Sequence, residues 1–132
     1  MLSLFPALLS YKLLAFALLR ISAGLVFLYL AYFHYTNRRK ATQELSLFVG
    51  SASVICVLYA LVELLVAVSL IAGAWTQLGA LLGALIACKV LLIRRSLHEL
   101  RPLSSLSYAL LAVICFCLVV TGAGIFAFDL PL

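Results

Sequence analysis

The chain has few charged residues and very few acidic ones. Charged residues make up 10% of its 132 residues, and four Asp or Glu stand against nine Lys or Arg. A soluble domain carries about a quarter of its residues as charges. With 67% hydrophobic residues and a mean hydropathy of +1.31, this chain cannot cover itself with polar surface. The composition excludes a soluble globular protein and predicts an integral membrane protein in contact with the lipid bilayer.

Several sequence features of other protein classes are missing. The chain shows no soluble domain, no nucleotide-binding loop and no metal-ligand cluster, which argues against an enzyme that is active by itself. Residues 1–12 have no basic n-region and no obvious small-residue cleavage motif, so we expect the first helix to act as its own insertion signal. The net charge of +5 comes from cations near helix ends. Such cations are typical of membrane orientation, so no nucleic-acid partner is expected.

Four apolar runs are separated by charges, prolines and turn-forming residues. They predict an all-α, multi-pass membrane protein in which residues 1–132 form a single bundle of four transmembrane helices. The predicted helices are residues 13–35, 47–72, 78–93 and 106–128. The third is short, because its 16 residues rise only about 24 Å. Trp75 at one end and Arg94 and Arg95 at the other can sit at the interfaces, so we count it as a crossing.

The cations are distributed unevenly between the two ends of these helices. Seven of the nine lie toward the first and third loops, and Lys12 and Arg20 lie toward the termini. Cytoplasmic loops carry an excess of Lys and Arg. We therefore expect loops one and three in the cytoplasm and both termini outside, although Lys12 and Arg20 act against this orientation. The seven cations are Arg38, Arg39, Lys40, Lys89, Arg94, Arg95 and Arg101.

Glu63 lies near the middle of residues 47–72, a run that holds no other charge. An ionisable group at such a depth is costly in lipid and normally faces protein or water. Arg20 lies about 10 Å, and Glu63 about 13 Å, from the corresponding ends of their helices. Because these depths match, we expect the two to pair, with Asp129 completing a polar cluster inside the bundle. The cluster is either a structural clasp or a site where a ligand such as a quinone exchanges protons.

Small and polar residues recur at three- and four-residue spacing on the first two helices, which predicts their inner faces. The first face is Ala17, Arg20, Gly24, Phe27, Ala31 and His34, and the second is Ala52, Cys56, Tyr59, Ala60, Glu63 and Ala67. Leu61, Leu64, Leu65 and Val68 are expected to face lipid. Gly79 and Gly83 are expected to let the third helix pack closely, within the bundle or between the copies of a homo-oligomer.

The cysteines and histidines are not expected to form a redox or metal site. All four cysteines fall inside predicted spans, where a thiol usually packs as a small hydrophobe, and Cys115 and Cys117 point to different faces of one helix. His34 lies at a helix end between tyrosines, and His98 lies in a basic loop. We therefore expect interfacial or solvated histidines rather than haem ligands, and no metal.

Three segments of the chain resemble the DoxX-like family of small four-helix membrane proteins. They are residues 18–21, residues 63–65 leading through 71–73, and residues 122–129, where Gly-Ala-Gly is followed by Asp. The resemblance covers nearly the whole chain and implies that Arg20, Glu63, Gly122, Gly124 and Asp129 are the characteristic residues here. The chain departs from the family at residues 31–35, where members often have a Gly and a Lys.

The resemblance also implies a role beside other proteins. Some members are associated with membrane oxidoreductases, including thiosulfate:quinone oxidoreductase and complexes with superoxide dismutase and sulfurtransferase partners. A related animal protein is an assembly chaperone for receptor channels. We therefore expect a subunit, not catalytic alone, that anchors or organises a membrane redox complex without a bound cofactor. The alternatives are a quinone-interacting oxidoreductase subunit in which Glu63 handles protons, and an assembly chaperone for membrane proteins.

Overall fold

The chain folds into α-helices throughout the part that can be described. The computed structural model describes residues 12–39, 52–92 and 102–121. Within them lie four helices, α1 (Lys12–Thr36), α3 (Ala52–Ala72), α4 (Thr76–Leu92) and α5 (Ser105–Thr121). The all-α fold class is thus confirmed. Helices α4 and α5 begin two residues and one residue before their expected starts, and the expected helical residues 47–51, 93 and 122–128 lie outside the described ranges.

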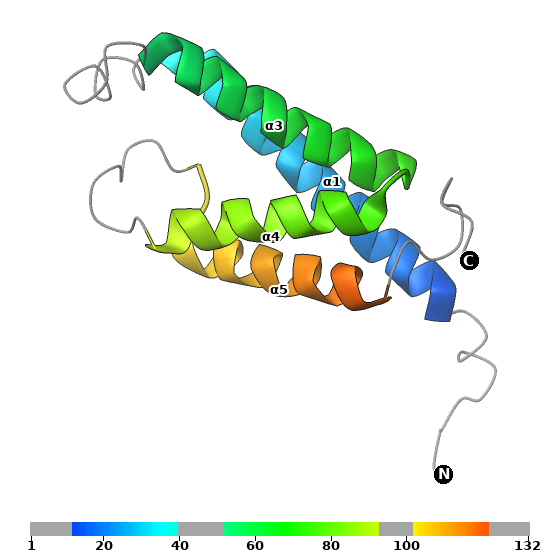
Figure 1. The fold of residues 1–132 in the computed structure, drawn as a ribbon. Coiled ribbons are helices and arrows are strands. Elements are labelled where there is room, and N and C mark those ends of the chain that lie inside the picture. Colours follow the sequence, from blue (N-terminus) through cyan, green and yellow to red (C-terminus); the bar gives the residue numbers. More distant parts are fainter. Residues whose placement is uncertain (1–11, 40–51, 93–101, 122–132) are drawn as a thin grey trace.

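The helices form two pairs. Helix α1 packs mainly against α3, and α4 packs mainly against α5, as Figure 1 shows. A short turn reverses the chain between α3 and α4. Gly73 ends α3 with a φ of 71°, a conformation that glycine adopts without steric cost, and its amide donates to the Ser69 carbonyl at 2.9 Å. The turn brings the second pair against the first.

Two of the described helices are long and apolar enough to cross a membrane. They are Leu14–Thr36 in α1 and Ser53–Ala72 in α3. Helices α4 and α5 are apolar but shorter, with 17 residues each. At 1.5 Å per residue they are about 25 Å long. The longer and the shorter helices therefore belong to different pairs.

The interior is apolar and closely packed around small residues. Phe27, Leu30 and Leu70 are fully buried between the pairs. A Cβ added to Gly24 would lie 2.7 Å from Ile71 Cγ1, and one added to Gly83 would lie 2.9 Å from the Phe27 ring. A larger side chain would not fit at either glycine unless the neighbouring side chains moved.

Gly79 of α4 is a third glycine with no room for a side chain. A Cβ on Gly79 would collide with the Ser69 hydroxyl.

Four large apolar residues of α3 point away from the bundle, with exposed fractions of 47%, 39%, 66% and 54%: Leu61, Leu64, Leu65 and Val68. Their exposure agrees with the expected lipid-facing side of this helix.

Candidate functional site

A buried carboxylate and a histidine are joined across the first helix pair. His34 Nδ1 on α1 and Glu63 Oε2 on α3 share a hydrogen bond of 2.7 Å. Glu63 is 1% exposed, whereas the side chain of His34 is 17% exposed. Helix α1 ends at Thr36, so His34 lies in its last turn, while Glu63 lies near the middle of α3. The histidine is therefore the member of the pair that is nearer to the end of the bundle.

Tyr59 lies one helical turn before Glu63 on the same face of α3 and completes this part of the site. Its ring meets the His34 ring edge to face, with centroids 5.4 Å apart and planes at 77°. The tyrosine thus packs against the imidazole that binds Glu63, and it lies one turn from the carboxylate on the same helix.

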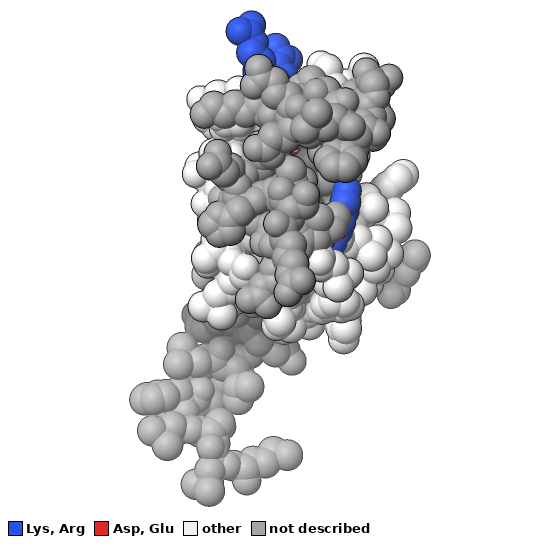
Figure 2. Space-filling view, turned by 90° about the vertical axis from the view of Figure 1, so that its left-hand side faces the viewer, with Lys and Arg blue, Asp and Glu red and all other residues white. Residues whose placement is uncertain are grey.

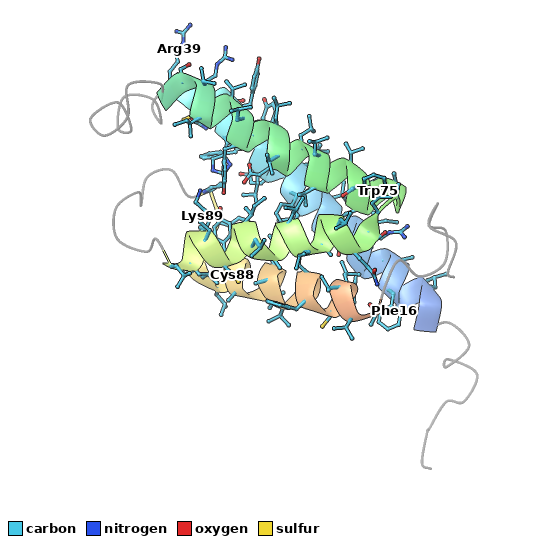
Figure 3. The ribbon with its side chains drawn as sticks, viewed as in Figure 1. Phe16, Arg39, Trp75, Cys88 and Lys89 are labelled. Carbon is cyan, nitrogen blue, oxygen red and sulfur yellow. The ribbon has the colours of Figure 1, made fainter. Side chains whose placement is uncertain are left out.

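The second helix pair adds a cation and a buried hydroxyl. Lys89 Nζ on α4 lies 5.2 Å from the centroid of the Tyr59 ring, a cation–π contact. Figure 3 shows Lys89 rising from α4 toward α1 and α3. Tyr108 on α5 is 2% exposed and belongs to the buried core against which Tyr59 packs. All four helices therefore contribute to one group, which we call the His34–Glu63 cluster: His34, Tyr59, Glu63, Lys89 and Tyr108.

The cluster lies toward the end of the bundle where α1 and α4 finish and α3 and α5 begin. Arg38 and Arg39 follow α1 at this end, and Arg39 is exposed. Figure 2 faces this end and shows Lys and Arg side chains on it. Apart from Lys12 and Arg20, the cations of the described residues thus lie at this end of the bundle. The His34–Glu63 pair lies toward the same end.

The partner of Glu63 differs from the expected one. The sequence predicted Arg20, and the structure gives Glu63 His34 instead. His34 follows Arg20 by 14 residues on α1. At 1.5 Å per residue, this is about 21 Å along the helix.

The physical reason is the relative position of α1 and α3 along their axes. Matching the depths of Arg20 and Glu63 assumed that the two helices begin and end together. Gly24 instead contacts Ala67 and Ile71, so the first turns of α1 extend beyond the end of α3, as Figure 1 also shows. Arg20 is nevertheless buried, with 1% of its surface exposed. Asp129, Gly122 and Gly124, the other predicted site and packing residues of this region, lie outside the described ranges.

His34 is the functional residue whose role sequence reasoning missed. Periodicity placed it on the inner face that includes Phe27 and Ala31, both buried, and its position at a helix end predicted an interfacial side chain. Neither signal identified Glu63 as its partner. Tyr59 was placed on the inner face of its helix by the same periodicity.

The side chains of the His34–Glu63 cluster have the chemistry of proton exchange and hydrogen bonding. No group of three or more His, Cys, Asp or Glu side chains that could hold a metal ion occurs among them. Cys115 is buried and Cys117 is exposed, as expected for two positions on different faces of one helix. The His34–Glu63 cluster instead combines a carboxylate, an imidazole, two hydroxyls and an ammonium group, which can hold and transfer protons and donate hydrogen bonds to a carbonyl oxygen.

Comparisons with known proteins add no relative. No protein-family model matches the chain, no curated protein matches it, and no solved structure matches it. The resemblance to the DoxX-like family therefore stays a prediction from the residues that carry it.

Proposed function

We propose that the chain is a four-span membrane subunit of a redox complex, and that His34 and Glu63 handle protons within it. The observation that carries this proposal is the 2.7 Å contact between a carboxylate that is 1% exposed and an imidazole nearer the end of the bundle. A proton site inside a membrane needs a second titratable group that connects it to water. His34 has the position that such a group requires.

Two observations support four crossings. Helices α1 and α3 are long enough to span, and α4 and α5, with 17 residues each, reach the lower limit of about 17 residues for a transmembrane helix. The outer surfaces of the shorter helices are also apolar: Leu81, Leu85, Leu110 and Val113 are 44%, 60%, 61% and 61% exposed. A lipid environment accounts for this exposure, which a soluble protein rarely tolerates over so large an area.

The orientation follows from the cations at the cluster end. Arg38, Arg39 and Lys89 lie there, and an excess of Lys and Arg marks the cytoplasmic side. In this orientation loops one and three face the cytoplasm and both termini lie outside. His34 then takes protons from the cytoplasmic side and passes them to Glu63.

A quinone is the ligand class that this chemistry fits. Reduction of a quinone to a quinol takes up two electrons and two protons. In this proposal the electrons come from an oxidoreductase partner. Glu63 gives up one proton to the quinone, regains a proton from the cytoplasmic side through His34 and then gives up a second, so that two protons accompany the two electrons. The cluster gives the subunit a chemical role that an anchor or an assembly chaperone does not need.

The test compares the wild-type protein with Glu63→Gln and His34→Gln after gentle extraction from its own membranes. Native mass spectrometry and lipid extraction on one sample report the protein partner and any bound quinone. Proton uptake during quinone reduction then reports the role of the pair. Ser22→Ala is the matched control, because Ser22 is exposed and its hydroxyl donates to the Leu19 carbonyl of its own helix.

We expect the wild type to retain an oxidoreductase partner or a quinone. Both glutamine variants should keep the partner and lose at least tenfold in proton-coupled turnover, because glutamine cannot transfer a proton. Ser22→Ala should behave as wild type. A wild-type protein isolated without partner or quinone, or a Glu63→Gln variant that turns over normally, would contradict the proposal.

A further inference from the structure

The outer side of the first helix pair carries an open apolar groove. Its volume is about 750 Å³, and its lining residues all come from α1 and α3. It runs along α1 from Leu25 to Tyr35, which is about 15 Å at 1.5 Å per residue. The floor includes Ala31 and Ala60, whose small side chains leave the space open. The groove therefore lies between the two helices that are long enough to cross a membrane.

The groove is apolar along its length and carries tyrosines on one wall. Tyr29, Tyr32 and Tyr35 follow each other at three-residue spacing on α1 and are 51%, 69% and 53% exposed. Leu61 and Leu64 of α3 form part of the opposite wall. Tyrosine places an apolar ring against hydrocarbon and its hydroxyl near the membrane interface. This combination suits a flexible hydrocarbon chain that runs from the interface into the bilayer.

A positive charge is fixed at one end of the groove. The guanidinium carbon of Arg38 lies 4.7 Å from the centroid of the Tyr35 ring, and Tyr35 itself lines the groove. Arg39 follows directly, and Figure 3 shows it at the end of α1, projecting away from the α4–α5 pair. Arginine binds phosphate through two parallel hydrogen bonds. The groove thus joins an apolar channel to a site suited to a phosphate group.

We propose that an anionic phospholipid of the leaflet at this end binds the α1–α3 groove. One acyl chain lies between the tyrosines of α1 and the leucines of α3, and the phosphate lies at Arg38 and Arg39. The negative phosphate complements the positive charge of the two arginines, which the headgroup of a neutral lipid does less well. A helix of a second protein fits the groove less well, because transmembrane helices approach closely over small residues and these walls are built of Leu and Tyr.

The proposal rests on α1 and α3 crossing a bilayer, and it does not rest on proton transfer by Glu63. The pair His34–Glu63 is absent from the groove lining. Glu63→Gln is accordingly expected to bind the lipid as the wild type does. Failure of lipid binding and failure of the proton role are therefore distinguishable.

The experiment reconstitutes the full chain in nanodiscs of phosphatidylglycerol or phosphatidylcholine with identical acyl chains. Native mass spectrometry after release then counts the retained lipids. Arg38→Gln removes the cation at the groove, and Lys12→Gln is its control because it removes one cation at the opposite end of α1. Leu61→Trp fills the groove, and Leu65→Trp is its control because Leu65 is exposed on α3 but does not line the groove.

We expect the wild type to retain phosphatidylglycerol in preference to phosphatidylcholine. Arg38→Gln should weaken phosphatidylglycerol retention about fivefold, the factor that corresponds to one basic residue at an anionic surface. Leu61→Trp should weaken the retention of both lipids, and both control variants should match the wild type. Equal retention of the two lipids by the wild type, or equal effects of Arg38→Gln and Lys12→Gln, would overturn the proposal. So would the finding of a second copy of the chain in place of the lipid.

Discussion

The inner and outer faces of the α1–α3 pair differ sharply although adjacent residues form them. Glu63, on the inner face, is 1% exposed and hydrogen-bonded to His34. Leu64, the next residue, is 39% exposed and lines the outer groove. The inner face is covered by α4 and α5, which supply Lys89 and Tyr108. A carboxylate is therefore stable on one side of α3 because His34 binds it and the second helix pair covers it. The other side offers an apolar surface.

The largest effect is expected when the carboxylate is moved from the inner face of α3 to its outer face. The double substitution Glu63→Leu with Leu64→Glu keeps the composition and moves the carboxylate to the outer face. It leaves His34 without its partner and places a charge against lipid. Together these changes should lower the free energy of unfolding by about 4 kcal/mol.

Chemical unfolding in detergent, followed by circular dichroism, measures this loss. Leu64→Gln is the control for a polar side chain on the outer face, and it should cost less than the reversal because it carries no charge. A reversed variant as stable as the wild type would show that the two faces are equivalent.

A smaller effect is expected from removing the histidine alone. His34→Leu leaves the Glu63 carboxylate buried without the imidazole, which should cost about 3 kcal/mol of stability. The double substitution His34→Leu with Glu63→Leu replaces the pair by apolar side chains and should recover most of that loss. The same unfolding measurement applies. If the double variant is no more stable than His34→Leu, the two side chains are not coupled.

The smallest effect is expected from widening the contact between α1 and α3 at Gly24. Gly24→Ala puts a methyl group 2.7 Å from Ile71 Cγ1 and 3.2 Å from the Ala67 carbonyl oxygen. The helices must separate slightly, which should cost about 1.5 kcal/mol. Ser22→Ala, at an exposed position of the same helix, should be neutral within about 0.5 kcal/mol. A neutral Gly24→Ala would mean that α1 and α3 are not held at this distance.

The helices and their faces could be predicted from the sequence because both depend on local periodicity. The apolar runs predicted helices at 13–35 and 78–93, and the structure has them at Lys12–Thr36 and Thr76–Leu92. The exposed side of α3 follows from the spacing of Leu61, Leu64 and Leu65. These features need only the hydropathy of residues that are close in sequence.

The contact between helices could not be predicted in the same way. The position of α1 along α3 depends on which side chains fit around Gly24, and that packing involves residues more than 40 positions apart. The depth comparison therefore selected Arg20 as the partner of Glu63. The structure gives His34, which lies on the expected face but was assigned to the membrane interface.

Cross-linking of paired cysteines tests the central claim, that His34 is the side chain at Glu63, most directly. In a chain whose four native cysteines are replaced by alanine, His34→Cys with Glu63→Cys is compared with Arg20→Cys with Glu63→Cys, using a short thiol-specific cross-linker in membranes. Mass spectrometry identifies the joined peptides. The structure predicts a cross-link in the first pair and none in the second. A cross-link between positions 20 and 63, with none between 34 and 63, would contradict the account.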